Sequence, residues 1–244
     1  MSISLEKHLY YDQWLSDVLQ HEVYRLDVTD EFFRIRESTI REYLSSKAPK
    51  NVFIYAKVRI SDLGAINFLE KLGFHLVDTN IVFEKSIDSE SRVSGPTEIR
   101  FAVPEDRQAV RSLAANSFSY SRFHLDPLIT DEKANLVKVS WADNFFLGKR
   151  GDSMVVASVD GKIAGFLQLL YSKEDLIIDL IAVDGLFRRK GVASDMILYA
   201  QRNLKGFNKV RVGTQLANIP SIRMYEKLEF IFSDASYVFH YHHS

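Results

Sequence analysis

Apolar and polar residues alternate along several stretches of the second half of the chain, and this period-two pattern predicts β-strands. The expected strands are Glu98–Val103, Ser153–Val159, Lys162–Tyr171, Asp175–Val183 and Asn208–Leu216, with a pair of strands within residues 230–242. Asp160 and Gly161 separate two of these strands, which indicates a hairpin with a two-residue turn.

Other stretches carry apolar residues at the spacing of a helix. The expected helices are Pro104–Phe118, Asp131–Phe146, Gly191–Lys205 and Asn218–Leu228. Proline and acidic residues open the first of them, as helix N-termini prefer. The mixture of expected strands and helices indicates an α/β protein.

A polar segment divides the chain. Residues 86–97, "SIDSESRVSGPT", are rich in Ser, charge, Gly and Pro, a composition that buries little surface and is typical of a linker. We therefore expect a smaller domain at 1–85 and a larger one at 98–244.

A repeated helix–strand unit connects the two domains. Ala65–Phe83 reads "AINFLEKLGFHLVDTNIVF" and Ser221–Phe239 reads "SIRMYEKLEFIFSDASYVF", with eight of nineteen positions identical without a gap. Two amphipathic units could have converged on this pattern. We prefer the interpretation that one half-domain is present twice. We call Ala65–Phe83 the first copy and Ser221–Phe239 the second copy.

Composition excludes several classes of function. The net charge of −1 gives no general attraction to nucleic acid, and the chain contains no cysteine for disulfides, thiol catalysis or Cys-ligated zinc. We find neither an apolar signal core at the start nor an apolar run long enough to cross a bilayer. We therefore expect a cytoplasmic protein without nucleic-acid or membrane partners.

The densest positive charge lies between an expected strand and an expected helix. Residues 188–193 read "RRKGVA", which places three cations at a helix N-terminus, where the helix dipole already contributes positive charge. Gly191 and Ala193 carry little side-chain bulk, so a phosphate could approach the backbone amides. A solvated basic helix start is the alternative. We favour a cradle for a diphosphate.

Two motifs resemble those of the GCN5-related N-acetyltransferase (GNAT) superfamily. "LIAVDGLFRRKGVA" is similar to its acetyl-CoA motif, and "NIPSIRMYEKLEF" is similar to its second motif through Asn218, Ser221, Tyr225 and Phe230. Glu229 stands where that motif has glycine, so the turn after the helix could differ. The resemblance implies a mixed, mostly antiparallel sheet flanked by helices over residues 98–244.

The resemblance also assigns residues to the cofactor and to the smaller domain. It implies acetyl-CoA as co-substrate, bound by Asn218 and by the residues of the first motif. These are Ile181, Ala182 and Val183 for the pantetheine arm, and Arg188, Arg189, Lys190, Gly191, Val192, Ala193 and Ser194 for the diphosphate. In the smaller domain, Leu69 replaces Tyr225 and Asp62 replaces Asn218, so 1–85 resembles a truncated, non-catalytic copy of the same fold.

Acetyl transfer to an amine requires proton transfers at two places. The departing thiolate must gain a proton, and Tyr225, which has this role in the family, could supply it as a general acid. A buried core tyrosine is the alternative. Asp179 lies inside an apolar strand and could take the amine proton through water, or it could be a structural acceptor. No metal is needed.

The acceptor site is expected around a loop and two strand positions. Residues 117–127, "SFSYSRFHLDP", resemble a loop of the GNAT subgroup that acetylates nucleotide-linked amino sugars. Arg122 could bind the nucleotide diphosphate, and Tyr120 or Phe123 could stack on a base. His124, Gln168 and Gln215 are further candidates. Ordinary surface packing is the alternative for this loop.

His240 and His242 share one strand face near the end of the sequence, a spacing that could hold a metal. Because no acidic residue is close to them in the sequence, we expect no metal site.

The resulting hypothesis is an acetyl-CoA-dependent N-acetyltransferase that acts on a dTDP-linked amino-dideoxy sugar, a small-molecule substrate. Another primary amine, such as a peptide or a metabolite, and a non-catalytic acyl-CoA-binding protein remain alternatives. The sequence leaves open whether the chain forms a homodimer.

Overall fold

The computed structural model describes residues 5–47, 51–86 and 98–243, with side chains of residues 46 and 47 left out. The expected linker lies almost wholly outside the described residues. The chain divides into two compact units. Unit 1 comprises residues 1–80, 121–133 and 235–244, and unit 2 comprises residues 81–120 and 134–234.

Unit 1 contains a small sheet with short helices. Its elements, in chain order, are η1 (Leu5–Lys7), β1 (Leu9–Tyr11), α1 (Gln13–Leu19), β2 (Glu22–Leu26), η2 (Phe32–Arg34), α2 (Glu37–Glu42), η3 (Tyr43–Lys47), β3 (Val52–Arg59) and α3 (Leu63–Lys71), with the first part of β4 (His75–Ser86) and most of β10 (Ile231–His243). β1 is antiparallel to β2, β2 is parallel to β3, and β3 is antiparallel to β10. Its core includes Phe32, Ile54, Leu69 and Phe239.

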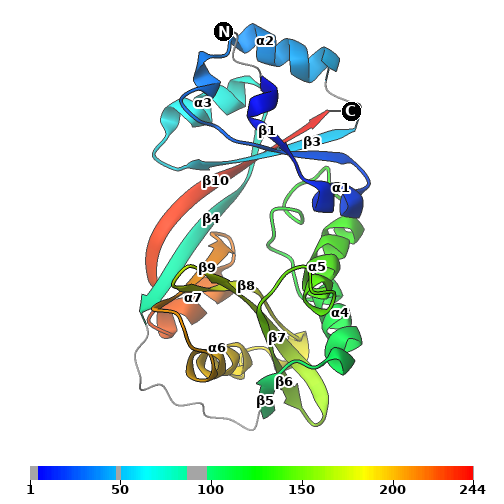
Figure 1. Ribbon diagram of the computed structural model, residues 1–244, viewed down its shortest axis with the longest axis vertical. Coiled ribbons are helices and arrows are strands. Elements are labelled where there is room, and N and C mark those ends of the chain that lie inside the picture. The colour runs from blue at the N-terminus through cyan, green and yellow to red at the C-terminus, as the bar shows by residue number, and fades with distance from the viewer. Residues whose placement is uncertain (1–4, 48–50, 87–97, 244) are drawn as a thin grey trace. The chain divides into compact units, whose positions relative to one another are not determined.

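Unit 2 contains most of the elements that the sequence predicts. Its elements are β5 (Glu98–Phe101), η4 (Pro104–Asp106), α4 (Arg107–Asn116), most of α5 (Asp131–Phe146), β6 (Ser153–Val159), β7 (Lys162–Ser172), β8 (Asp175–Val183), η5 (Gly185–Phe187), α6 (Val192–Asn203), β9 (Lys209–Gln215) and α7 (Ile219–Lys227), with the ends of β4 and β10 that unit 1 does not include. Strands β5 to β8 form an antiparallel meander, and β9 adds in parallel to β8. The mixed, mostly antiparallel sheet flanked by helices is confirmed (Figure 1).

The faces of this sheet follow from the alternation of side chains along β7. Phe166 belongs to a core cluster with residues of α4 and α5, and it is completely buried. The neighbouring Gly165 faces α6, where an added Cβ would lie 2.9 Å from the Met196 side chain. Glycine at this position lets α6 approach the sheet closely, so helices cover both faces of unit 2.

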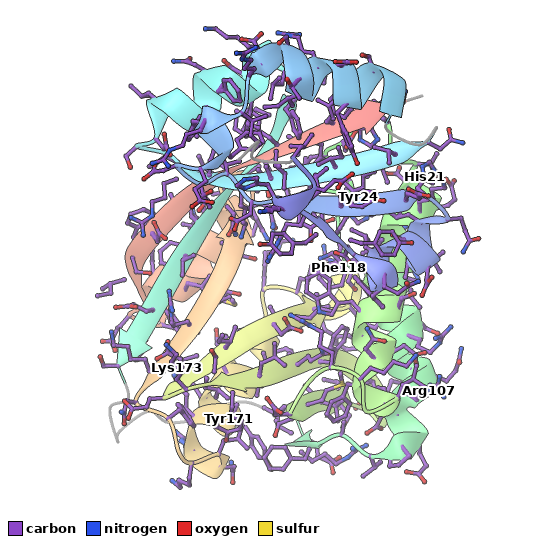
Figure 2. The ribbon with its side chains drawn as sticks, turned by 45° about the horizontal axis from the view of Figure 1, so that its top comes forward. His21, Tyr24, Arg107, Phe118, Tyr171 and Lys173 are labelled. Atoms are coloured by element: carbon purple, nitrogen blue, oxygen red, sulfur yellow. The ribbon has the colours of Figure 1, made fainter. Side chains whose placement is uncertain are left out.

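Ion pairs join α4 to α5 in unit 2. Arg107, labelled in Figure 2, donates from its guanidinium to both carboxylate oxygens of Asp143 at 2.7 and 2.9 Å. Arg111 donates to the same carboxylate at 2.6 Å. Because the Asp143 side chain is buried, these hydrogen bonds provide its charge compensation and hold the pKa of Asp143 below its usual value, although burial alone would raise it.

The expectation of two strands within residues 230–242 is wrong. Ile231–His243 is one continuous strand, β10. Ser233 and Asp234, near the start of the expected pair, are both extended within this strand and have exposed side chains.

The compact units follow different boundaries from the expected domains 1–85 and 98–244. Residues 121–133 and 235–244 belong to unit 1, because β10 supplies the antiparallel partner of β3 from Ser236 to His243. The domain boundaries, which rest on the repeat and the linker, stay a prediction.

Candidate active site

Strand β8 separates from its parallel neighbour at the candidate site. The two strands pair from Asp175↔Lys209 to Ile178↔Val212, although β8 continues to Val183 and β9 to Gln215. On its other edge, β8 stays paired with β7 through Val183. The β7–β8 register shifts so that Gln168 faces Leu180 and Leu169 faces Ile178. The extra residue is Asp179, and such a bulge increases local twist and bends the strand.

The residues expected to contact the pantetheine arm lie beyond this bulge. Ile181, Ala182 and Val183 are paired with β7 on one edge, past the end of the pairing with β9. An extended arm with amide groups could add to the backbone of β8 there, as an extra strand does at an open sheet edge.

The basic loop connects β8 to α6. Asp184 accepts a hydrogen bond from the Leu186 amide at 2.8 Å and so begins the turn η5. Arg189 and Gly191 both adopt positive φ, +63° and +85°, and Gly191 is the N-cap of α6. The two left-handed residues turn the chain sharply, and the exposed first amides of α6 suit a phosphate.

The three cations of this loop have different environments. Arg188 donates from its guanidinium to the carbonyl oxygens of Val183 at 3.0 Å and Ser117 at 3.1 Å. Lys190 lies over the Phe187 ring, with Nζ 5.3 Å from the centroid. The Arg189 residue is exposed. Arg188 thus orders the loop in this structure. Of the other expected contacts, Val192 is buried, whereas Ala193 and Ser194 are partly exposed.

Helix α7 carries the candidate general acid. Asn218 is its N-cap, and the side-chain oxygen accepts from the Ser221 amide at 3.4 Å. Tyr225 is 1% exposed, and its ring packs against Phe83 and Phe230. Burial raises the pKa of Tyr225 well above its usual value, so the hydroxyl is protonated at neutral pH but is a weaker acid than a solvated tyrosine. The same burial also fits the core alternative.

Asp179 is surrounded by donors. Its carboxylate accepts from Trp141 Nε1 at 2.8 Å, from Arg150 at 2.6 and 2.8 Å, and from Gln168 Nε2 at 3.0 Å. A base must present a free lone pair to the amine, whereas donors from three side chains already occupy this carboxylate. The geometry therefore favours the structural alternative for Asp179. Trp141 and Arg150, whose side chains hold it, had no recognisable pattern in the sequence.

Gln168 also differs from the expected lining of an open acceptor site. It is completely buried, because β7 is an interior strand and the amide is turned toward Asp179. Gln215 is partly exposed at the end of β9, and its carbonyl accepts from the Asn218 amide at 2.9 Å.

The expected acceptor loop contributes to the interior of unit 1. Arg122 lies over the rings of Tyr55 and Phe123, at 4.0 and 4.4 Å, and donates to His240 Nε2 at 3.0 Å. Burial lowers the pKa of Arg122 to about 10. Its guanidinium is thus engaged within the unit, rather than presented to a diphosphate as we expected.

The other residues of this loop have separate positions. Phe123 is 2% exposed, so it is a core residue and cannot stack on a base as expected. His124 Nδ1 lies 2.6 Å from Ser121 Oγ. Tyr120, which belongs to unit 2, is exposed and keeps a ring face available for stacking.

The two histidines of β10 meet a carboxylate that sequence reasoning missed. Asp126 Oδ2 lies 2.5 Å from His240 Nδ1 and 2.7 Å from His242 Nε2. Three such groups could hold a metal ion. The reason given for expecting no metal, the absence of a nearby acid, is therefore wrong: the fold brings Asp126 across 114 positions of sequence.

Arg122 determines which protons this cluster holds. It has only N–H donors, so His240 Nε2 must accept, and the proton of the neutral ring is on Nδ1, directed at Asp126. A metal on Nδ1 would move that proton to Nε2, against Arg122. The arrangement therefore favours a proton-bridged Arg122–His240–Asp126–His242 network over a metal centre.

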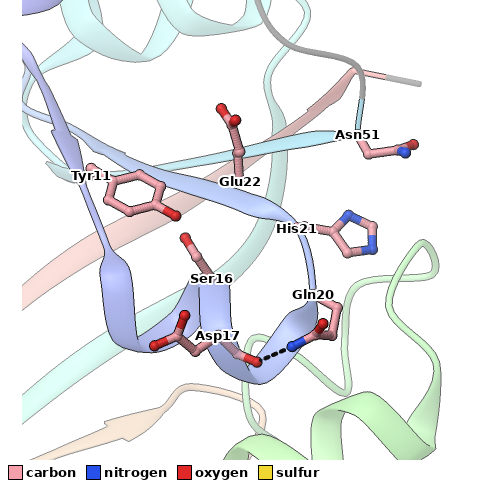
Figure 3. Close-up of a pocket in the computed structure, with 7 residues that line it drawn as sticks. All are labelled: Tyr11, Ser16, Asp17, Gln20, His21, Glu22 and Asn51. Atoms are coloured by element: carbon pink, nitrogen blue, oxygen red, sulfur yellow. Dashed lines mark hydrogen bonds between the residues drawn. The ribbon is translucent and has the colours of Figure 1, made fainter.

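Unit 1 also contains a pocket of about 380 Å³, lined by Tyr11, Ser16, Asp17, Gln20, His21, Glu22 and Asn51 (Figure 3). Asp17 and Glu22 contribute carboxylates. Burial lowers the pKa of His21, whose Nε2 accepts from Lys133 at 2.7 Å, so the ring is neutral. The lining disfavours a diphosphate, because its acidic side chains are two carboxylates and its imidazole is neutral.

Comparison with known proteins identifies the family. The model of the acetyltransferase (GNAT) family matches residues 109–230, which is half of the chain and contains both motifs. The chain belongs to the GNAT acetyltransferase family. It is an N-acetyltransferase, which moves an acetyl group from acetyl-CoA to an amine.

Similarity to two curated proteins extends beyond the matched region. The chain is 28% identical over 241 residues to the spore coat polysaccharide biosynthesis protein SpsD of Bacillus subtilis, covering 95% of this chain and 82% of that protein. It is 25% identical over 178 residues to the dTDP-fucosamine acetyltransferase of Escherichia coli O6:H1, covering 70% of this chain and 74% of that enzyme.

Solved structures support the fold. A GCN5-related N-acetyltransferase from Sphaerobacter thermophilus has a TM-score of 0.63 at 15% identity, over 96% of this chain and 75% of that one. A tandem GNAT protein from the clavulanic acid biosynthesis pathway has a TM-score of 0.60 at 15% identity, over 90% and 75%. Within the described residues, no helix combines the length and apolarity needed to span a membrane.

Proposed function

We propose that this GNAT enzyme acetylates the amino group of a dTDP-linked amino-dideoxy sugar. One observation carries the proposal. The similarity to a polysaccharide biosynthesis protein extends over 95% of the chain, and a dTDP-fucosamine acetyltransferase matches over 70%. Similarity over this length includes residues outside the acetyl-CoA motifs. Those residues can determine which acceptor the enzyme binds.

The proposed reaction uses the separated edge of β8. The pantetheine arm pairs with Ile181–Val183, and the diphosphate binds the first amides of α6 with Arg189 and Lys190 beside it. The amine nitrogen attacks the thioester carbonyl carbon, and the carbon–sulfur bond breaks. The sulfur takes the proton of the Tyr225 hydroxyl, and the proton lost by the amine returns to solvent, which reprotonates Tyr225.

Asp179 then has a supporting role in the proposal. Its hydrogen bonds with Trp141, Arg150 and Gln168 fix the bulge that separates β8 from β9. For the acceptor, the exposed Tyr120 and the partly exposed Gln215 remain candidates. A cytoplasmic location stays a prediction, which a localisation experiment would test, and light scattering would decide whether the chain forms a homodimer.

The decisive experiment measures acetyl-CoA consumption with dTDP- and UDP-linked amino sugars, using free amines and a peptide as controls. The proposal expects a kcat/KM for a dTDP-linked amino sugar at least about a hundredfold above that of the free sugar amine, because binding of the nucleotide contributes to transition-state stabilisation. Equal rates with nucleotide-linked and free amines would refute it.

A further inference from the structure

The turn after α7 has an unusual residue in a left-handed conformation. Glu229, which stands where the GNAT motif has glycine, adopts φ = +62°. The corresponding residue of the first copy is Gly73, with φ = +89°. The turn therefore keeps its backbone shape, contrary to the expectation that it could differ, and a side chain here strains the backbone. Something must stabilise Glu229 in this conformation.

Lys85 supplies the stabilising contacts. Its ammonium donates to the Leu228 carbonyl at 2.9 Å and to the Glu229 carboxylate at 3.1 Å. The Lys85 side chain is only 8% exposed. A buried ammonium needs such partners, and a cation at the C-terminal end of a helix also compensates the helix dipole. Lys85 thus fixes both the last turn of α7 and the residue that follows it.

The same turn is bonded directly to Tyr225. The Tyr225 carbonyl accepts from the amides of Leu228 and Phe230, each at 3.0 Å. Phe83 packs on the Tyr225 ring, with centroids 6.1 Å apart. Because Phe83 and Lys85 are two residues apart on β4, they lie on one face of that strand. One strand face therefore contacts both the ring of Tyr225 and the turn that holds its backbone.

We propose that Lys85 is a positioning residue for the Tyr225 hydroxyl, acting through the left-handed turn at Glu229. The inference rests on the proposed role of Tyr225 in protonating the thiolate. The first copy needs no such lysine, because glycine adopts the turn without strain. Lys85 and Glu229 together replace that glycine in the second copy.

The test compares three variants by kcat, KM for acetyl-CoA and melting temperature. Lys85→Met should lower kcat about tenfold, with KM changed less than about twofold, because a displaced reacting group affects the chemical step more than binding. Lys85→Arg should retain most of kcat. The double variant Lys85→Met/Glu229→Gly should regain kcat to within about threefold of the parent protein, since glycine removes the need for the lysine.

Two controls separate positioning from general stability. Lys209→Met removes the lysine that bonds Glu84, the neighbour of Lys85 on β4, at 3.1 Å, and it should leave kcat unchanged. If Lys85→Met does not fold, Glu229→Lys opposes the ammonium with a like charge from an exposed position. It should lower kcat several-fold, whereas Glu226→Lys, also exposed and on α7, should not.

A signal independent of activity completes the test. The ¹³Cζ resonance of Tyr225, assigned by its loss in Tyr225→Phe, should shift in Lys85→Met and return in the double variant. If the resonance and kcat are both unchanged in Lys85→Met, Lys85 does not position Tyr225. If Tyr225→Phe is inactive in the same experiment, the proposed function still stands. Full activity of Tyr225→Phe would refute the role of Tyr225 itself, and the resonance alone would then decide whether Lys85 positions the ring.

Discussion

The two copies of the helix–strand unit share their backbone hydrogen bonds. In the first copy, the Phe74 amide donates to the Leu69 carbonyl at 3.0 Å, and the Ile66 amide donates to Asp62 at 3.0 Å. The equivalent bonds of the second copy, Phe230 to Tyr225 and Ile222 to Asn218, measure 3.0 and 3.1 Å. Asp62 and Asn218 both cap their helices.

The side chains differ where the backbone does not. Leu69 is completely buried in the core of unit 1, and Tyr225 is 1% exposed in unit 2. A buried position of this helix therefore accepts either an aliphatic chain or a phenol. The comparison teaches that the fold requires only an apolar residue of suitable size there, so the hydroxyl of Tyr225 needs an explanation other than packing.

The largest effect is expected from a substitution in the basic loop between β8 and α6. This loop precedes the second copy, and the first copy has no counterpart of it. Gly191→Glu should abolish acetyl-CoA binding, because it places a carboxylate and a side chain at a φ of +85° where the diphosphate would lie. Calorimetry measures the binding, and circular dichroism verifies the fold. Asp160→Glu, in an exposed turn that also has positive φ, is the control and should bind normally.

The next effect makes the second copy chemically like the first. Tyr225→Phe keeps the ring and removes the proton, so kcat should fall by about a hundredfold or more, with acetyl-CoA affinity nearly unchanged. Leu69→Tyr, the reverse exchange, should leave turnover unchanged and cost about 1–3 kcal/mol of stability through overpacking. Near-normal turnover in Tyr225→Phe, with a lowered melting temperature, would identify a core residue.

The strands that follow the two helices differ in their titrating groups, because β10 carries the buried His240. This difference should appear as a pH dependence of the stability of the fold. Burial lowers the pKa of His240 to about 4, from 6.5 in an unfolded chain, so the unfolded state binds the proton first as pH falls. Stability should therefore decrease as pH falls from about 6.5 to 4. Asp126 acts in the same direction at lower pH, because the histidine hydrogen bonds outweigh its burial and lower its pKa.

Urea unfolding at a series of pH values measures this dependence. His240→Asn should be less stable at pH 7 and should lose most of the slope between pH 6.5 and 4. His75→Asn, an exposed histidine on β4, should keep the slope of the parent protein. A slope that survives in His240→Asn would assign the titration elsewhere.

The smallest effect concerns the turn that both copies share. Gly73→Ala should cost about 1–2 kcal/mol, because alanine is strained at φ = +89°. Gly64→Ala, inside α3 with an ordinary 3.6 Å contact for the added Cβ, should instead be neutral or stabilising by up to about 1 kcal/mol. If Gly73→Ala and Gly64→Ala both lower the melting temperature, or both raise it, backbone conformation does not determine how alanine at these positions changes stability.

Local pattern predicted most elements of unit 2. The expected bounds of Asp131–Phe146 and Asp175–Val183 agree with α5 and β8, because long periodic runs determine their own secondary structure. The strand pair expected within residues 230–242 is a single strand, β10, because the length of a strand depends on partner strands that are distant in the sequence.

The chemistry of single residues was harder to predict, because it depends on distant partners. Asp126 is brought to His240, and Arg150 to Asp179, by strand and loop geometry that leaves no local pattern. Arg122 was expected to bind a diphosphate, but its guanidinium contacts Tyr55 and His240 in the same unit. The sequence shows which side chains carry charge, and the fold decides what each charge contacts.

The pairing of β3 with β10 has a consequence for the order of events during synthesis. Arg59 pairs with Ser236, 177 positions later in the chain. During translation the first eighty residues are made long before the strand that completes their sheet, while residues 81–120 and 134–234 can already assemble. Until β10 is synthesised, the edge of β3 that pairs with it stays unpaired. Unpaired strand edges promote aggregation, and nascent chains that expose them depend on chaperones.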